Sequence, residues 1–204
     1  MGVELSVIIT AKDKNDLKLK DLIWSIRQQS FKNYEIIVET QGDSESAKGI
    51  ALLKTKGKIV CILASDNYLN DTTLFDKAMY QFNNYNIVAT YPKKYYYYKD
   101  DNILNRYFAL FGCNDPIPLY LSKNDKLPYY PVKKTFNFKT YGDNGFFIRK
   151  EILLKSNIKH YYHIDNIYDL WLQGYTIWNI DTSIWHRTGG NIFSFFIKRF
   201  KYAD

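Results

Sequence analysis

Residues 58–67 read Lys-Ile-Val-Cys-Ile-Leu-Ala-Ser-Asp-Asn, an apolar run that ends abruptly in polar side chains. The uniform run over residues 59–64 predicts a strand that is buried on both faces of a sheet. Asp66 then follows at the carboxyl end of this strand, which is where open α/β sheets bind their ligands. A carboxylate there suits a hard divalent cation, and through the cation a diphosphate. The competing interpretation is that Asp66 only shapes a turn or caps the next helix.

The sequence around this run alternates between strand and helix patterns over the first 91 residues. Strands are predicted at residues 5–10, 34–39, 59–64 and 87–91, and helices at 16–29, 47–56 and 71–82. Gly57 is expected to end the second of these helices. The alternation is typical of an α/β protein with a Rossmann-like, mostly parallel sheet flanked by helices and joined by right-handed crossovers.

The sequence changes character after residue 91. All five prolines lie within residues 92–140, together with many Lys and Asn residues and the tyrosine run 95–98. This composition predicts a long, partly irregular insertion with one helix near 103–111, and long loops over a sheet often form substrate surfaces. We interpret the tyrosine run as a feature of composition. Helices at 149–155, 165–173 and 191–202 and a strand at 176–180 complete the prediction.

Composition narrows the class of protein. The chain has 204 residues and 46% hydrophobic residues, enough to bury a core without covalent crosslinks. Its two cysteines form no disulfide framework, which favours a reducing compartment. No stretch approaches 18 consecutive apolar residues, and no signal peptide is apparent. These features predict a cytoplasmic protein.

The net charge of +7 is compatible with nucleic acid, anionic lipid or phosphorylated substrates. A nucleic-acid partner is not expected, because the basic residues are spread out and no known motif is present. A non-catalytic nucleic-acid binder is still the alternative hypothesis, because Tyr and Lys interleave over residues 91–134. The final predicted helix carries an apolar stripe beside three cations: Phe193, Phe196, Phe200, Lys198, Arg199 and Lys201. This helix either packs on the domain or contacts an anionic membrane, which would place the protein at the inner membrane face.

Several short motifs follow one another in a fixed order. They are Gly42-Asp-Ser44, Ser65-Asp66, the segment Tyr-Gly-Asp-Asn-Gly-Phe-Phe-Ile-Arg at 141–149, His163-Ile-Asp165 and Ile184-Trp-His186. In this order they resemble the inverting family-two glycosyltransferases of the GT-A fold, over nearly the whole chain. The resemblance implies one GT-A catalytic domain over residues 1–204. Residues 1–91 would bind a nucleotide-sugar, 92–190 would form the acceptor side, and 191–204 would form an amphipathic helix.

The resemblance also implies roles for individual residues. The family's Asp-X-Asp motif aligns with residues 64–66, where Ala64 replaces the first acid and Asp66 matches the metal-binding one. Only the second acid of the catalytic pair is present, and this residue, Asp165, matches the base. His186 matches a histidine near the metal or diphosphate. Mn²⁺ or Mg²⁺ is therefore expected at Asp66 and His186.

The other implied site residues lie after the predicted strands. On the donor side they are Thr10, Ala11, Lys12, Glu39, Gln41, Lys48, Ser65 and Asn67, and on the acceptor side Asn144 and Gly145. Each has a simpler interpretation that the sequence leaves open. The two lysines can be solvated surface residues, and Asn144-Gly145 can be a turn before a strand. Asp165 can be a helix N-cap, and His186 a partly buried histidine without a ligand.

These residues fit glycosyl transfer with inversion. A carboxylate such as Asp165 takes the proton from an acceptor hydroxyl as it attacks the anomeric carbon. A divalent cation neutralises the leaving diphosphate. The expected partners are a nucleotide-diphosphate sugar and a glycan or lipid-linked acceptor.

The missing acids also permit a degenerate enzyme that binds a sugar-nucleotide without turnover. A nucleotidyltransferase is less favoured, because residues 11–16 lack a Gly-rich basic loop. A zinc site at His160, His163 and Asp165 is less favoured because no cysteine lies near them.

Overall fold

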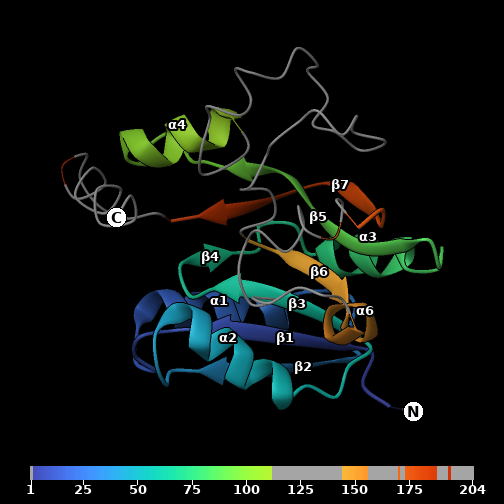
Figure 1. Cartoon of the computed structure of the whole chain (residues 1–204). Helices are drawn as coiled ribbons and strands as arrows, with labels where there is room; N and C mark the ends of the chain where they lie inside the picture. The colour runs from blue at the N-terminus through green and yellow to red at the C-terminus, as the bar shows by residue number, and fades with distance from the viewer. Residues whose placement is uncertain (1, 112–143, 156–169, 171–172, 188–192, 194–204) are drawn as a thin grey trace.

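The computed structural model describes residues 2–111, 144–155, 170, 173–187 and 193, and the structural statements below concern these residues (Figure 1). Asp165, His160 and His163 lie outside them, as do nearly all of the predicted helices 165–173 and 191–202. No helix in the described ranges is long and apolar enough to span a bilayer.

Strands and helices alternate through the first part of the chain. The strands are β1 (Leu5–Thr10), β2 (Tyr34–Glu39), β3 (Ile59–Ala64), β4 (Asn67–Tyr68), β5 (Ile87–Tyr96), β6 (Phe146–Arg149) and β7 (Thr176–His186). The helices are α1 (Leu17–Arg27), α2 (Ser44–Leu53), α3 (Leu74–Gln81), α4 (Ile103–Phe111) and α6 (Lys150–Lys155). Helix α1 begins where the Asp16 side chain accepts a hydrogen bond from the backbone N–H of Lys18, an ordinary N-cap.

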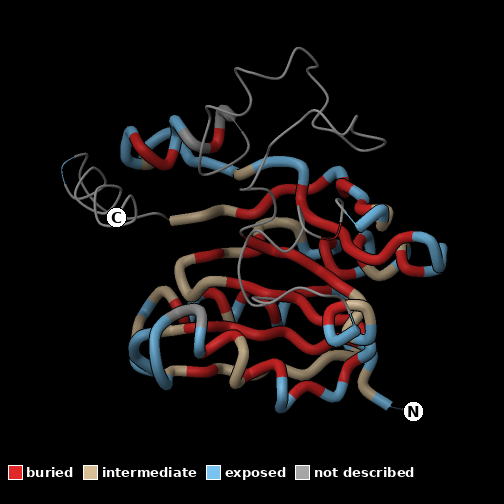
Figure 2. The backbone as a smooth tube through the Cα atoms, in the orientation of Figure 1, coloured by how far each residue is buried: buried red, intermediate tan, exposed pale blue. Residues whose placement is uncertain are grey.

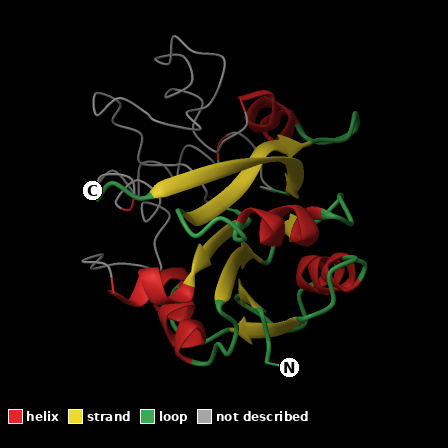
Figure 3. Cartoon of the chain, turned by 90° about the vertical axis from the view of Figure 1, so that its right-hand side faces the viewer, coloured by secondary structure: helices red, strands yellow, loops and turns green. Residues whose placement is uncertain are grey.

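The strands form one sheet in the order β2-β1-β3-β6-β5-β7-β4. Strand β1 is parallel to β2 and β3, and β5 is parallel to β7. Strand β6 runs antiparallel to both β3 and β5, and β4 runs antiparallel to β7. All strands except β4 and β6 therefore point the same way. Helices lie on both sides of the sheet (Figure 3). This confirms the predicted α/β fold with a mostly parallel sheet.

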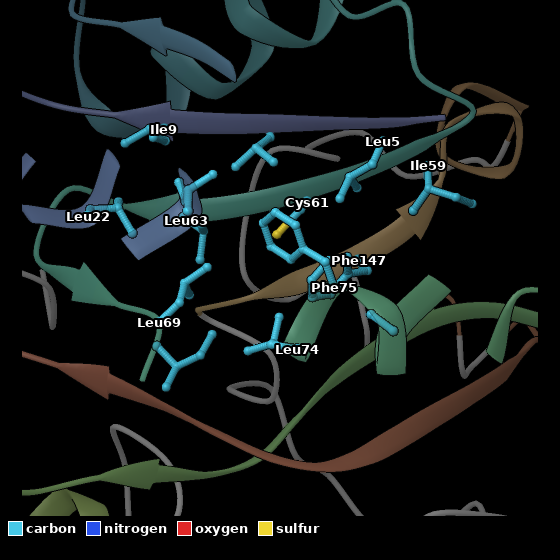
Figure 4. Close-up of a cluster of buried hydrophobic side chains, with 14 of the residues drawn as sticks. Leu5, Ile9, Leu22, Ile59, Cys61, Leu63, Leu69, Leu74, Phe75 and Phe147 are labelled. Atoms are coloured by element: carbon cyan, nitrogen blue, oxygen red, sulfur yellow. The ribbon is translucent and has the colours of Figure 1, made fainter. Parts of the chain in front are cut away.

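The sheet is buried between two apolar layers, and its strands are red along much of their length in Figure 2. Leu5, Val7 and Ile9 of β1 face one layer, which contains apolar residues of α1 and α3 (Figure 4). Ile8 faces the other layer, which contains residues of α2 and α6. This alternation follows from the two-residue period of a strand. Because both faces are covered, these central strands read as continuous apolar runs in the sequence.

The predicted bounds of β1, β2, β3 and α4 are confirmed by the structure. Strands β5 and β7 continue further than predicted, to Tyr96 and His186. The far half of β5 pairs with β7 alone, because β6 pairs only with Ala89 and Thr90. That half of β5 is largely exposed, so its polar residues gave no strand pattern. The two-residue strand β4 is too short to show any period.

The interpretation of Gly57 as a helix stop is wrong. Helix α2 already ends at Leu53. Gly57 instead allows the chain to pass close to β1, since a Cβ atom at this position would lie 2.5 Å from the backbone nitrogen of Ser6. Its role in the packing is therefore to permit a close approach of two backbones.

Candidate functional site

The carboxyl ends of the first three strands meet at one edge of the sheet. Thr10 is the register partner of both Glu39 on β2 and Ala64 on β3. The Ser65 N–H donates to the Thr10 carbonyl at 3.2 Å, and the Ala11 N–H donates to the Glu39 carbonyl at 3.0 Å. The loops that leave these strands therefore start side by side, at the position where parallel α/β sheets bind ligands.

Asp66 and His186 are brought together by the pairing of β4 with β7. Asn67 is the register partner of His186, so the turn before β4 lies beside the end of β7. The Asp66 Oδ1 atom lies 3.4 Å from His186 Nε2, and the Arg187 N–H donates to the Asp66 carbonyl at 2.9 Å. The two side chains are 30% and 11% exposed, respectively, so the pair is accessible mainly through the carboxylate.

The surroundings of Asp66 favour its charged form. Burial raises the pKa of this carboxyl, but the proximity of His186 and the Lys18 charge outweigh burial and lower the pKa below its ordinary value. The buried Oδ1 atom nevertheless has no hydrogen bond of normal geometry. A buried carboxylate oxygen whose nearest polar neighbour is an imidazole nitrogen at 3.4 Å is incompletely satisfied, and this is consistent with a bound cation at that oxygen.

A divalent cation fits this pair of side chains. A carboxylate oxygen and an imidazole nitrogen together suit Mn²⁺, and the carboxylate alone suits Mg²⁺. Within the part of the chain that the structure describes, no group of three or more His, Cys, Asp or Glu side chains could hold a metal. Asp66 and His186 therefore supply at most two ligands from this part, and the others would come from substrate or water.

Two asparagines complete the surroundings of His186. Asn67 is fully buried, and its Oδ1 accepts the Ala64 N–H at 3.0 Å, so it closes the turn that presents Asp66. Asn144 donates from Nδ2 to the Tyr95 hydroxyl at 3.0 Å and lies 3.4 Å from His186 Nδ1. Gly145 holds Asn144 in place, with φ +73° and a hydrogen bond from its N–H to the Ile62 carbonyl at 3.0 Å.

The other predicted donor residues differ in their surroundings. The Glu39 carboxylate accepts from the Lys54 ammonium at 2.5 Å and from the N–H groups of Thr40 and Gln41. These bonds, led by that from Lys54, lower the pKa of Glu39. Its carboxylate is thus already engaged within the protein. Lys12 and Gln41 are exposed on the loops after β1 and β2, whereas Lys48 is buried on α2.

Four residues near the pair, Arg187, Asp21, Lys18 and Tyr95, were not identified as site residues from the sequence. The Arg187 guanidinium donates to the Asp21 carboxylate at 2.7 Å and to the Lys18 carbonyl at 2.9 Å. Lys18 in turn donates from Nζ to the Arg187 carbonyl at 3.0 Å, so α1 is bound to the end of β7. The Tyr95 ring lies 5.4 Å from that of His186, centroid to centroid. The position of Arg187 next to His186 was the one available signal, because the other contacts arise only from the tertiary structure.

Comparison with known proteins gives matches in structure alone. No protein-family model and no curated protein matches the sequence. S. aureus TarS 1-349 in complex with UDP matches 89% of this chain and 59% of its own, at 13% identity and a TM-score of 0.55. The same protein in complex with UDP-GlcNAc matches 93% of this chain and 62% of its own, at 14% identity and a TM-score of 0.52. The mannosyltransferase PcManGT from Pyrobaculum calidifontis, in complex with GDP-Man and Mn²⁺, matches 45% of this chain and 35% of its own, at 17% identity. Its TM-score of 0.40 supports no inference about this chain.

These matches concern the fold. The chain spans about 60% of the length of the TarS 1-349 chains, and the identities are low. The sheet order and the helices on both faces agree with this likeness. The predicted resemblance is therefore confirmed at the level of architecture: the chain has a fold of the GT-A type.

Proposed function

We propose that this chain is a glycosyltransferase that uses a nucleotide-diphosphate sugar. The observation that carries the proposal is the approach of Asp66 and His186 at the carboxyl edge of a GT-A sheet, with Asp66 Oδ1 buried and lacking a hydrogen bond. Support also comes from TarS, which has this fold and is seen with UDP and with UDP-GlcNAc. A buried carboxylate beside an imidazole, at the edge where α/β sheets bind ligands, is suited to a cation-bound diphosphate.

In this proposal the two side chains and their neighbours bind the donor. Asp66 and His186 hold Mn²⁺ or Mg²⁺, which supplies positive charge to the leaving diphosphate. Lys18 adds to the positive potential at Asp66, as its effect on the Asp66 pKa indicates. Backbone groups at the ends of β1, β2 and β3 meet the nucleotide, through Thr10, Ala11, Glu39, Gln41, Ser65 and Asn67. Lys12 and Lys48 are proposed to add charge on the donor side.

Asp165 is proposed as the base. It takes the proton from the acceptor hydroxyl, whose oxygen forms the new bond at the anomeric carbon while the bond to the diphosphate breaks, which inverts that carbon. Asn144 and Gly145 are proposed to belong to the acceptor side. The acceptor is proposed to be a glycan or a lipid-linked sugar, and the helix predicted at 191–202 could bring the enzyme to an anionic membrane surface at the cytoplasmic side.

The test is release of nucleotide from a panel of UDP-, GDP- and dTDP-sugars with Mn²⁺, with and without added acceptor glycans. We expect release from one donor and its loss after chelation of the metal. Asp165→Asn should still bind the donor but lose turnover, and Asp169→Asn, four residues further along the sequence, is the matched control. Turnover by Asp165→Asn at the wild-type rate would remove the base assignment. Absence of both binding and release with every donor would remove the whole proposal.

A second candidate function rests on one feature. Ala64 stands where the family has the first acid of its metal-binding motif, and Ile164 stands before Asp165 in place of the other missing acid. The same fold could therefore bind a sugar-nucleotide without turning it over. Tight donor binding with no release and no transfer in the same panel would favour this second function.

A further inference from the structure

We infer that Asn144 is a positioning residue that sets which ring nitrogen of His186 carries the proton, and so prepares Nε2 to bind a cation. This inference rests on the proposed function, because it assigns a role at the same cation site. It goes further because it assigns Asn144 the role of orienting the metal ligand His186, in place of a role on the acceptor side.

Each ring nitrogen of His186 has a polar side chain near it. Nε2 faces Asp66 Oδ1 at 3.4 Å, and Nδ1 faces the amide nitrogen Nδ2 of Asn144 at 3.4 Å. The same amide lies 3.0 Å from the Tyr95 hydroxyl, and the Tyr95 ring lies against the imidazole. Asn144 is only 4% exposed, so solvent has little access to compete for these contacts.

The chemistry of a neutral imidazole then determines what Asn144 must do. A histidine binds a cation through an unprotonated nitrogen, so a cation at Nε2 requires the proton to sit on Nδ1. Histidine ligands usually donate that second N–H to an oxygen, which fixes the tautomer and the ring orientation. The amide of Asn144 can provide this oxygen, since its O and N ends exchange by a half-turn about the last side-chain bond.

The two orientations of the amide match two states of the site. With nitrogen toward the ring, Asn144 donates to Tyr95 and to Nδ1, and the proton of His186 lies on Nε2, facing the Asp66 carboxylate. With oxygen toward the ring, Asn144 accepts from Nδ1 and from the Tyr95 hydroxyl, and Nε2 presents a lone pair. The hydroxyl of Tyr95 can accept in the first state and donate in the second, so it is satisfied in both.

The backbone keeps Asn144 at this point. The next residue, Gly145, has φ +73° and is hydrogen-bonded to β3 through Ile62. A Cβ atom at Gly145 would lie 2.2 Å from Ile184 Cδ1, so the two segments are in close contact. Gly145 is therefore held against β7 at Ile184, two residues before the strand ends at His186, and this places the neighbouring Asn144 amide beside His186.

The test measures Mn²⁺ binding and the histidine tautomer in the same set of variants. Free Mn²⁺ is followed by its electron paramagnetic resonance signal in the presence of UDP. Asn144→Leu removes the amide and should weaken Mn²⁺ binding by roughly 10-fold. Asn144→Asp restores an oxygen that can accept from Nδ1 and should bind Mn²⁺ at least as tightly as the wild type. Tyr95→Phe removes a single hydroxyl and should weaken binding by a smaller factor.

The tautomer is read from long-range ¹H–¹⁵N spectra, which are simple because the chain has three histidines. His186 is assigned with His186→Gln, and Mg²⁺ with UDP replaces the paramagnetic ion. We expect the Nδ1–H form in the wild type and in Asn144→Asp, and its loss in Asn144→Leu. Circular dichroism checks that each variant is folded, and Tyr95→Phe carries the test if Asn144→Leu does not fold.

The outcomes separate this inference from the proposed function. If the wild type and the folded variants bind Mn²⁺ equally and keep the same tautomer, the positioning role is wrong while the cation site stands. If the wild type binds no Mn²⁺ with UDP, both the positioning role and the cation site are wrong.

Discussion

The two ends of the central strands hold buried polar groups in different ways. At the amino ends, the Ser6 hydroxyl donates to the Glu35 carboxylate at 2.6 Å and accepts the Gly57 N–H at 2.7 Å. The Lys56 N–H also donates to Glu35, at 2.6 Å. At the carboxyl ends, Asp66 Oδ1 and Asn67 Nδ2 are buried with no hydrogen bond of normal geometry. The Ser6 and Glu35 side chains are hydrogen-bonded within the protein, whereas Asp66 Oδ1 has only the longer contact with His186 Nε2, and Asn67 Nδ2 has no hydrogen bond among the described residues.

A lowered pKa does not distinguish these two ends. Burial raises the pKa of Glu35, but the hydrogen bonds from Ser6 and Lys56 outweigh it and lower the pKa below its ordinary value. The pKa of Asp66 is lowered too, through His186 and Lys18. What differs is whether the carboxylate oxygens already have donors. The difference teaches that a lowered pKa alone does not mark a ligand site, since structural networks also shift pKa values; what marks Asp66 is its place beside His186 at the carboxyl edge of the sheet together with its lack of a hydrogen bond at Oδ1.

The largest expected difference between the two ends is in activity. Asp66→Asn should lower nucleotide release by about 100-fold or more, because charge stabilisation of the leaving group is lost. Glu35→Gln removes a carboxylate at the amino ends of the strands and should change nucleotide release by less than about twofold, provided that the variant folds. Steady-state rates at saturating donor and Mn²⁺ measure both. A similar loss in both variants would mean that the two ends do not differ in function.

Glycine substitutions should destabilise the fold at either end of the strands but weaken cation binding at only one of them. Gly145→Ala should cost at least about 2 kcal/mol of unfolding free energy, because φ is +73° and the new Cβ would meet Ile184 at 2.2 Å. Gly57→Ala should cost about 1–3 kcal/mol, through its approach to the Ser6 backbone. Urea denaturation gives both values. Only Gly145→Ala should also weaken Mn²⁺ binding, and equal binding by the two folded variants would contradict this.

Loss of the Ser6–Glu35 hydrogen-bond network should lower the stability of the fold and leave cation binding unchanged. Glu35→Gln leaves the Ser6 hydroxyl and the Lys56 N–H with a weaker acceptor, and should cost about 1–2 kcal/mol of unfolding free energy. Its affinity for Mn²⁺ with UDP should equal that of the wild type. The matched control is Glu151→Gln on α6, where the carboxylate is exposed, and this change should stay within about 0.5 kcal/mol.

The smallest expected effect is a difference in pH dependence. The pKa of Glu35 is lower in the folded chain than its ordinary value, so its ionised form stabilises the fold. That contribution is fully present above the unfolded pKa, about 4.3, and is lost as the pH falls through the folded pKa. The stability difference between the wild type and Glu35→Gln should therefore be constant from about pH 5 to 7 and shrink below about pH 4.3. Denaturation midpoints across this range measure it, and a difference that grows toward acid would contradict the assignment.

The sequence was most informative where the protein is most uniformly buried. Strand β3 is buried on both faces through Leu63, so its run of apolar residues fixed its bounds. The far half of β5 lacks a second partner strand and carries exposed polar residues, so its sequence resembles a loop. A strand segment that is largely exposed has neither the continuous apolar run nor the apolar/polar alternation by which a strand is recognised in a sequence.

The candidate site was predictable as a set of residues but not as an arrangement. Asp66 and His186 were identified from their motifs, and the structure brings them within 3.4 Å. The approach itself depends on the register of β4 against β7, which no local pattern encodes. Tyr95 looked like part of a compositional run, and its contact with His186 arises only when β5 lies beside β7. The role of Asp165 is still a prediction, because it lies outside the described residues.

The pairing of β4 has a consequence for the order of assembly. Within the described sheet, β4 hydrogen-bonds to β7 alone, although some 120 residues separate Asp66 from His186. Arg187 then joins the end of β7 to α1, near the start of the chain. A nascent chain that has emerged only as far as β4 can build the parallel core and pack β4 against α1, but it lacks the strand with which β4 pairs. The site is therefore completed late in synthesis, when β7 emerges and docks.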